Sequence, residues 1–443
     1  MDLEEPLLSE YGRASSRPAP VSRMMAQFAG DFRDQVDINL GVGYVNENTI
    51  PRQWILEALE EVLAHPWKHR AAFNYGGPIG SPNLIQSLRR FYLEHRIGGV
   101  SEQVLDRRQI IIGPNGASSL LEAMAQVLPP GLVVTTDPIY YIYCDFLERM
   151  GFEICAVPED AEGIDIEGLE GALARLGRRL EDIRFFYLVT VNNPTGTILS
   201  TGRRRQVVEM ASRLSHRLGR KVPVVFDLAY ELLIHDPAVS PPLSGLLFDE
   251  GGIVYEIGTL SKILAPALRI GYLIGPDGPM LQALVQKTSD TGFSAPLMNQ
   301  EMASVLLDRH AAEQLEKVRA GYRQKAQKTL KWIQSRLGDW LAAMSGGQAG
   351  FYFYLTFHRI ETHEESPFFR FLARTTGSAS IDGPPEAKHP RVVYIPGQFC
   401  VHRRGSLCQR GRRQLRLSYG FEELDRIEQA LGLMEEAAAY AAQ

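Results

Sequence analysis

The chain has 443 residues, of which 45% are hydrophobic and 22% are charged, so it is long enough for two domains with sizeable cores. Its formal net charge of −5 at pH 7 gives no reason to expect a nucleic-acid partner from bulk electrostatics. No apolar run is long enough to span a bilayer, so no membrane partner is expected.

The four cysteines are too few for a disulfide framework, which is typical of a protein in a reducing compartment. The acidic N-terminus, MDLEEPLLSE, lacks the basic segment and long apolar core of a secretory signal. We therefore expect a cytoplasmic location. Cys400, His402 and Cys408 match no usual zinc spacing, so no metal site is predicted.

Residues 1–36 are expected to form an N-terminal arm that is partly flexible, because the segment up to about Pro20 is rich in Glu, Ser, Pro and Arg. Residues 37–310 are expected to form a large domain. Residues 311–443 are expected to form a smaller C-terminal domain that packs with the N-terminal segment.

After a short strand that begins at Ile38 and helices near 51–64 and 82–95, the pattern alternates between strand and helix. The predicted strands cover residues 110–112, 132–135, 153–157, 185–191, 222–226, 252–257 and 270–274, and the helices among them cover about 119–127, 140–150, 166–176 and 202–218. This alternation predicts an α/β fold with a mostly parallel sheet and helices on both faces.

The C-terminal part has a different pattern. A long helical stretch is expected from about Met298 to Leu337. Beyond it, predicted strands at 350–355, 391–395 and 415–418 and a final helix at 422–438 indicate a smaller α+β domain.

Three polar turns follow predicted strands, after Ile112, Val191 and Phe226. Because ligands of parallel sheets bind beyond the carboxyl ends of the strands, we expect these turns to gather on one functional rim.

The stretch from Gly258 to Tyr272 places Lys262 among small and hydroxyl-bearing residues in a strand–loop–strand pattern. A partly desolvated lysine can form a Schiff base with a carbonyl group. By itself this lysine is equally consistent with a solvated surface residue, which is the commoner case.

Four other features are candidates for the same site, each with a structural alternative. The residue types from Asn192 to Gly196 are also those of an ordinary turn. Asp227, three residues before Tyr230, could be the N-cap of a helix. The segment from Asn115 to Ser118 begins a predicted helix, and its free N–H groups could bind a phosphate. The alternative is an ordinary helix cap without a ligand. Arg416, between two leucines, could bind a substrate carboxylate or form a structural ion pair.

The order of these motifs is more specific than any one of them. Asn-Asn-Pro-Thr-Gly at 192–196, Asp-x-x-Tyr at 227–230 and Ser-Lys-x-x-x-Pro-x-x-Arg-x-Gly-Tyr at 261–272 follow one another. In this the chain resembles the fold-type I pyridoxal-phosphate enzymes, specifically the class I/II aminotransferase family, from about Asp37 to the C-terminus.

The resemblance implies a cofactor, pyridoxal 5′-phosphate (PLP), bound by the large domain. Lys262 would form its Schiff base and act in catalysis with Asp227, on the ring nitrogen, and Tyr230, which with Asn193 bonds the ring's phenolic oxygen. The residues expected to hold the phosphate are Ala117, Ser118, Thr259, Ser261 and Arg269. Tyr140 would stack on the ring, or simply pack among its neighbouring tyrosines.

The resemblance also implies partners. Arg416 would bind the α-carboxylate of an amino acid or 2-oxo acid, with help from Gly43 and Asn193. Tyr75 would reach the phosphate of a neighbouring subunit, which implies a homodimer with shared sites.

The implied reaction is transfer of an amino group from an amino acid to a 2-oxo acid. A PLP-dependent lyase, synthase or decarboxylase would share the same cofactor residues. A regulator on this fold is a remote alternative, because the segment before Asp37 is too short and insufficiently basic for a DNA-binding domain. Family members that act on dicarboxylates often have a second arginine in the loop before a Ser-x-Pro segment. Residues 288–296 lack an arginine and contain Asp290, so the resemblance implies a neutral or amine-bearing donor rather than aspartate. Cys400 could touch the substrate or pack.

Overall fold

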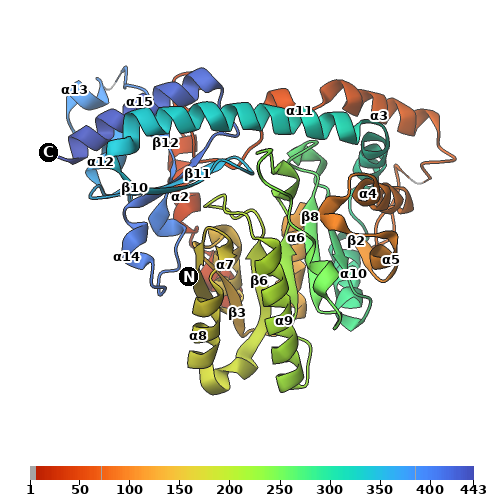
Figure 1. Cartoon of the computed structure of the whole chain (residues 1–443). Coiled ribbons are helices and arrows are strands. Elements are labelled where there is room, and N and C mark those ends of the chain that lie inside the picture. Colours follow the sequence, from red (N-terminus) through yellow and green to blue (C-terminus); the bar gives the residue numbers. More distant parts are fainter. Residues whose placement is uncertain (1–5, 71, 385) are drawn as a thin grey trace, which may run out of the picture.

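The computed structural model describes residues 6–70, 72–384 and 386–443. Figure 1 shows a large α/β body, a smaller antiparallel sheet, and a long helix, α11, that runs across both. No helix in the described ranges is both long and apolar enough to cross a membrane.

The central sheet has eight strands in the order β2-β9-β8-β7-β6-β3-β4-β5. Their bounds are β2 Gln109–Gly113, β3 Leu132–Asp137, β4 Glu153–Asp160, β5 Gly163–Ile164, β6 Ile183–Val189, β7 Val224–Asp227, β8 Val254–Thr259 and β9 Gly271–Gly275. Only β9 and β5 run against their neighbours, so the predicted mostly parallel sheet is confirmed.

Helices cover both faces of this sheet, as predicted. Successive side chains of a strand point to opposite faces, and Val224 and Phe226 of β7 pack in one buried cluster while Val225 packs in another. On the first face lie α8 (Ile166–Leu176) and α9 (Thr201–Leu218); on the second lie α6 (Gly116–Val127), α7 (Tyr141–Arg149) and α10 (Pro279–Gly292). Because β2, β6 and β7 run in the same direction, the polar turns at their carboxyl ends meet on one rim of the sheet, as predicted.

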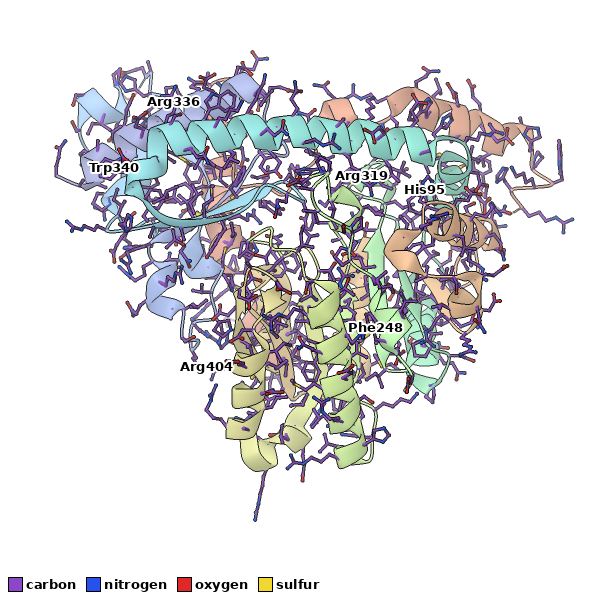
Figure 2. All side chains as sticks on the ribbon, in the orientation of Figure 1. His95, Phe248, Arg319, Arg336, Trp340 and Arg404 are labelled. Carbon is purple, nitrogen blue, oxygen red and sulfur yellow. The ribbon has the colours of Figure 1, made fainter. Side chains whose placement is uncertain are left out.

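Helix α11 (Leu297–Leu337) is continuous and crosses residue 310, where the domain boundary was predicted. One end packs on α3 (Arg52–Ala64) and α4 (Pro82–Glu94), and the other on α15 (Leu424–Ala441). Midway along it, Nε of Arg319 donates a hydrogen bond of 2.9 Å to the Leu232 carbonyl, next to the rim (Figure 2). The helix thus contacts both parts of the chain.

The smaller sheet is antiparallel, in the order β10-β11-β14-β13. Its strands are β10 Leu341–Gly346, β11 Tyr352–Phe357, β13 Ile395–Pro396 and β14 Gln414–Ser418, accompanied by α12 Pro367–Ala373, α13 Ala379–Asp382 and α14 Cys408–Gly411. In the register of β11 and β14, Tyr354 pairs with Arg416. The predicted α+β character of this part is confirmed.

Two helices, α1 (Glu10–Ser15) and α2 (Pro20–Ala29), lie within the segment predicted to be an arm. Residues 1–5 of that arm are outside the described residues. After α2, β1 (Ile38–Asn39) pairs in parallel with β12 (Val392–Val393), and buried Asp37 forms an ion pair with Arg391 at 2.8 Å. The N-terminal segment is thereby joined to the C-terminal part. A further short helix, α5 (Glu102–Asp106), precedes β2.

Candidate active site

Two adjoining cavities lie on the rim, with volumes of about 260 and about 390 Å³. The smaller lies over the carboxyl ends of β6, β7 and β8 and reaches the start of α6. The larger extends toward α2, α7 and the smaller sheet. Residues shared by both walls are Gly43, Tyr44, Tyr140, Asn193, Tyr230 and Lys262.

Lys262 is positioned by the loop that follows β8. The Thr259 hydroxyl donates to the Ile270 carbonyl at 2.8 Å and lies 2.9 Å from the Ser261 hydroxyl, which ties the two sides of the loop together. Nζ of Lys262 donates to the Gly43 carbonyl at 2.9 Å. It also lies 5.5 Å from the ring centre of Tyr230. The amine therefore points to the junction of the two cavities.

The charge of Lys262 is disfavoured at this place. Burial, together with the positive charges of Arg269 and Arg416, lowers the pKa of the amine from its ordinary value of 10.5 to about 8. Asp227 acts in the opposite direction but does not outweigh the other groups. About a tenth of the amine is therefore neutral, and nucleophilic, at pH 7, which is far more than for a lysine with the ordinary pKa of 10.5.

Asp227 is the last residue of β7 and lines the smaller cavity. Its carboxylate accepts hydrogen bonds from the Tyr187 hydroxyl at 2.8 Å and the Ala229 N–H at 3.0 Å. Burial raises the pKa of this carboxyl group. Within the described residues it has no salt-bridge partner, so a cationic ligand atom could fill that role.

The opposite end of the smaller cavity is an anion cradle. Ala117 and Ser118 lie in the first turn of α6, which has no side-chain cap, so their N–H groups face the cavity without a helix acceptor. A Cβ atom on Gly271 would lie 2.1 Å from the Ala117 nitrogen, so only glycine lets β9 pack this close to the helix.

Arg269 completes the cradle. Its backbone is left-handed, with φ of 56°, a strained conformation for a residue other than glycine. The guanidinium is fixed by hydrogen bonds to Asn115 Oδ1 at 2.7 Å and to the Pro266 carbonyl at 3.1 Å. Ser261 and Thr259 line the same wall.

Arg416 lies on β14 and is 2% exposed. One of its nitrogens donates to Asn193 Oδ1 at 2.7 Å and another to the Gly41 carbonyl, and the guanidinium lies 4.4 Å from the ring centre of Tyr352. Within the described residues, no carboxylate pairs with it, and its Nε has no hydrogen-bond partner. A structural ion pair is thereby excluded there. The unpaired cation faces the larger cavity.

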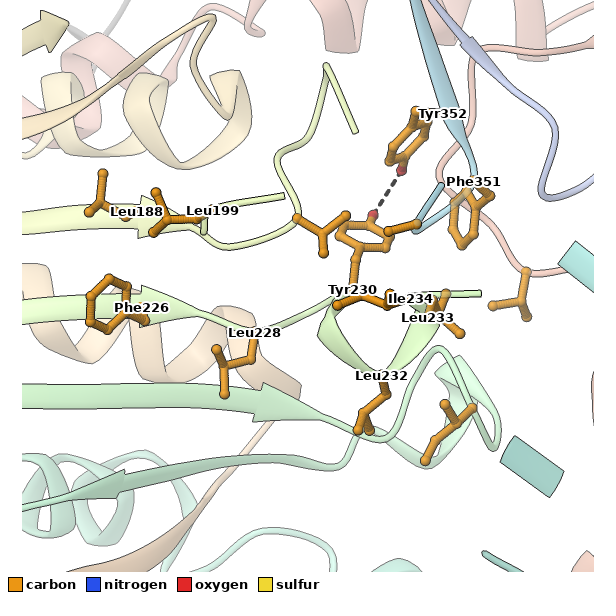
Figure 3. Packing of buried hydrophobic residues seen from close by; sticks show 14 of the residues in the cluster. Leu188, Leu199, Phe226, Leu228, Tyr230, Leu232, Leu233, Ile234, Phe351 and Tyr352 are labelled. Carbon is orange, nitrogen blue, oxygen red and sulfur yellow. Dashed lines mark hydrogen bonds between the residues drawn. The ribbon is translucent and has the colours of Figure 1, made fainter. Parts of the chain in front are cut away.

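Tyr352 is a site residue that the sequence analysis missed. Its hydroxyl is 2.8 Å from the Tyr230 hydroxyl, and Figure 3 shows the two rings approaching each other from β11 and from the turn after β7. A Cβ atom on Gly43 would lie 2.5 Å from the Tyr352 hydroxyl, which explains the glycine at that position. Alternation along the aromatic run of β11 was the available signal, but it does not say which ring faces a site.

The structure does not bring every predicted residue into the cavities. Tyr75 is 74% exposed and packs at a tilt against Phe293 on the surface, with ring centres 5.2 Å apart. Asp290 is exposed on α10, where it accepts a hydrogen bond from Gln286 at 2.7 Å. Cys400 is buried outside both cavity walls, and burial raises its thiol pKa to about 12, so it packs as a neutral thiol.

Helix α2 is the second feature that was missed. Val21, Ser22 and Met25 line the larger cavity opposite Tyr141 and Ile395. The apolar spacing of Val21, Met24 and Phe28, at i, i+3 and i+7, was the signal for an amphipathic helix.

The site therefore combines an anion cradle, a buried carboxylate, an amine of lowered pKa and a buried guanidinium that faces a second cavity. Together these groups can hold a phosphorylated cationic ring, react with a carbonyl carbon and bind a carboxylate. Among the residues that the structure places, no group of three or more His, Cys, Asp or Glu is arranged to hold a metal ion.

Comparison with known proteins agrees with this geometry. Residues 35–375 match the family model "Aminotransferase class I and II". The 2-aminoadipate transaminase of Thermus thermophilus is 32% identical over 237 residues, 52% of this chain and 56% of that relative. The HTH-type transcriptional regulator YisV of Bacillus subtilis is 24% identical over 440 residues, 97% of this chain and 79% of that relative.

Solved structures share the fold. The multiple substrate aminotransferase of Thermococcus profundus has a TM-score of 0.81 at 19% identity, with 98% of both chains covered. The α-aminoadipate aminotransferase LysN of Thermus thermophilus, solved with N-(5′-phosphopyridoxyl)-L-leucine, has a TM-score of 0.75 at 24% identity, with 97% of both chains covered. Because its family model covers most of the sequence, this chain belongs to the class I and II aminotransferases, a family of pyridoxal-phosphate-dependent enzymes.

Proposed function

We propose that the protein transfers an amino group from an amino acid to a 2-oxo acid, with PLP held at Lys262. One observation carries the proposal: the amine of Lys262 lies where the cavity of Asp227 and the anion cradle meets the cavity of Arg416. The first cavity suits a cofactor and the second a carboxylate-bearing substrate.

The residues present fit this cofactor. The first turn of α6 with Ser261 and Arg269 would hold the phosphate, and Asp227, which lacks a cationic partner among the described residues, would pair with the ring nitrogen. Tyr230 and Asn193 would bond the phenolic oxygen, and Tyr140, in the walls of both cavities, would lie against the ring. When bound, PLP supplies an electron sink for negative charge that develops at the substrate α-carbon.

The protein residues then have distinct tasks. Arg416 would bind the substrate carboxylate with parallel hydrogen bonds, while Asn193 and the Tyr352 ring keep the guanidinium in place. This would hold the substrate α-carbon near Lys262. The free amine of Lys262 would then act as a general base and take the proton from the α-carbon. Burial lowers the pKa of Lys262 and so increases the neutral fraction of the amine, which is the form that accepts a proton.

A regulatory protein is the second candidate. It is favoured by the alignment to the HTH-type regulators YisV and YdfD, which cover 97% and 75% of this chain. A sensor of this kind would take up PLP and an amino acid without sustained turnover. The assays below therefore measure turnover as well as binding.

We also propose a homodimer with shared sites and a cytoplasmic location. Trp67, Phe73, Tyr75, Ile79 and Phe293 are all large apolar residues that are at least 49% exposed in the single chain. A second copy that covers them would remove this apolar surface from water and could bring Tyr75 to the neighbouring phosphate. The four cysteines are free, which suits a reducing compartment.

The function is tested by trapping. We expect the protein with PLP to be yellow, borohydride to fix the cofactor to Lys262, and an amino acid to bleach the colour while a 2-oxo acid is released. Lys262→Ala removes both the nucleophile and the base, so turnover should fall by roughly 10²–10⁴-fold or more. Peptide mass spectrometry and spectra provide the readout, and Lys328→Ala, at an exposed position, is the control.

A wild-type protein that stays colourless with added PLP would contradict the proposal. Release of carbon dioxide, or of ammonia, without the pyridoxamine form would instead support a decarboxylase or lyase on the same scaffold.

The reactivity of Lys262 should depend on pH in a defined direction. Only the neutral amine reacts with acetic anhydride, so in cofactor-free protein labelling of Lys262 should rise with pH and reach half its maximum near pH 8. Arg269→Gln removes a positive charge that lowers this pKa, and the midpoint should shift upward. Competitive labelling with mass spectrometry gives both values. A wild-type midpoint at the ordinary lysine value would refute the electrostatic account.

The larger cavity favours a neutral amino donor. Its walls beyond Arg416 include Val21, Met25 and Ile395. Burying an apolar side chain there is worth about 1.5–3 kcal/mol, so kcat/KM for leucine should exceed that for aspartate by at least roughly tenfold. Steady-state kinetics over a set of amino acids measures this ratio. A clear preference for aspartate would overturn the prediction.

Arg149 also lines this cavity and could bind an acidic side chain, which would be an exception to the expected preference for a neutral donor. If glutamate is a good donor and Arg149→Gln abolishes only that activity, Arg149 rather than the apolar wall determines the side chain accepted.

Tyr75 tests the shared site. If its hydroxyl reaches the phosphate in the neighbouring subunit, Tyr75→Phe should weaken PLP binding by about tenfold, the value of one hydrogen bond to a charged group. Light scattering should give twice the mass of the chain for both proteins. Tyr11→Phe, also exposed, is the control. A wild-type monomer at assay concentrations would exclude the proposed role.

A further inference from the structure

A third cavity, with a volume of about 410 Å³, lies at the other end of the central sheet. Its walls come from the segments that precede β3, β7 and β8, from the first residues of β6 and β8, and from the start of α10 and the turn before it. Because the site of Lys262 lies at the carboxyl ends of these strands, the two cavities are separated by the length of the sheet.

Three cations line this cavity: Arg184, Arg220 and Lys221. Their partners are main-chain carbonyls. Arg184 donates to the Glu181 carbonyl at 2.9 Å, Arg220 donates to the same oxygen at 2.9 Å, and Lys221 donates to the Gly252 carbonyl at 3.0 Å. None of them forms a salt bridge within the described residues. The cations are thus held in place but are not neutralised.

Because Arg184 and Arg220 donate to the same Glu181 carbonyl oxygen, their guanidinium groups lie close together. Burial and the nearby charge of Arg184 both lower the pKa of Arg220, which is the sign expected of like charges in contact. Each guanidinium keeps N–H groups that no carbonyl uses, since Arg184 uses Nε and Nη1 and Arg220 uses Nη2. An anion could accept these N–H groups and relieve the repulsion.

Helix α10 adds to the positive potential. It begins at Pro279 without a side-chain cap, and Gly278, Pro279 and Met280 line the cavity. The first N–H groups of the helix have no acceptor within it and carry the positive end of its dipole. Asp277 lines the cavity as well, and its carboxylate accepts the Gly278 N–H at 2.8 Å.

The remaining wall is apolar. It is formed by Leu128, Pro129, Pro223, Ile253, Tyr255 and Met280. Inorganic anions would leave this wall in contact with water, whereas a phosphate attached to a flat organic body would cover it.

We infer that this cavity is a binding site for a small organic phosphate, whose phosphate lies between Arg184, Arg220 and Lys221 and whose planar body lies against Tyr255 and its apolar neighbours. The inference is independent of the proposed aminotransferase activity, because none of these residues lines the cavities around Lys262.

Adenosine 5′-monophosphate and inorganic phosphate are the probes, titrated calorimetrically into full-length protein that carries PLP at Lys262 and has been freed of excess PLP. We expect one adenosine monophosphate per chain, weaker binding of inorganic phosphate, and weaker binding of both at high salt. Arg220→Gln should weaken adenosine monophosphate binding by at least about tenfold, and Lys221→Glu by a similar factor. Lys221 is exposed, so Lys221→Glu remains informative if Arg220→Gln fails to fold.

Arg107→Gln is the matched control, because it removes an exposed arginine elsewhere and should leave binding unchanged. Absence of saturable binding of either probe, or equal affinity in the wild type and the two cavity variants, would overturn the inference. So would equal affinity for phosphate and adenosine monophosphate, since the apolar wall would then contribute nothing. Binding that Arg269→Gln abolishes and Arg220→Gln leaves intact would place the probe at the anion cradle and overturn it as well.

Discussion

Positive charge that is buried without a carboxylate partner is the constraint on which the site depends. Arg416 is held by an amide oxygen, a carbonyl and an aromatic face, and Lys262 by a carbonyl. Burying a cation costs several kcal/mol unless it is compensated, and dipoles of this kind compensate only in part. The rim therefore keeps a positive potential that an anionic cofactor and a carboxylate substrate would satisfy. In the cavity lined by Arg184 and Arg220 the guanidinium groups are more exposed, but they too are held by main-chain carbonyls rather than by carboxylates.

Neither sheet could build this site alone. The large sheet contributes Asp227 and the loop of Lys262, while the smaller sheet contributes Arg416 and Tyr352. The contact between them is polar and short, through the hydroxyl pair of Tyr230 and Tyr352 and the bond from Arg416 to Asn193. A rigid-body shift that separates the sheets by about an ångström would lengthen both bonds and change the position of the Arg416 guanidinium relative to the Lys262 amine. Helix α11, which packs against elements of both parts, opposes such a shift.

The sequence predicted the sheet, its helices and the rim, because apolar runs and polar turns at strand ends are local signals. It also predicted that Lys262, Asp227 and Arg416 belong to one site, because the order of the motifs along the chain is more specific than any single motif. It could not predict that Tyr352 meets Tyr230, because no motif includes Tyr352 and alternation along the aromatic run of β11 does not say which ring faces the site. Strand β10 was missed for a different reason: it lies at the edge of its sheet, it is largely exposed, and its sequence LAAMSG has little β-propensity. Helix α2 was obscured by its proline- and arginine-rich surroundings.

Burial shifts the two titrating groups of the site toward their neutral forms, and this one cause raises the pKa of Asp227 and lowers that of Lys262. Each shift is sensitive to what fills the smaller cavity. A cation beside Asp227 would favour the carboxylate and lower its pKa again. A phosphate beside Arg269 would offset part of the positive charge that lowers the pKa of Lys262, and would raise the basicity of the amine. What fills the smaller cavity would thus also set the basicity of Lys262: the empty site has the larger fraction of neutral amine, and a bound phosphate would increase the fraction that holds a proton.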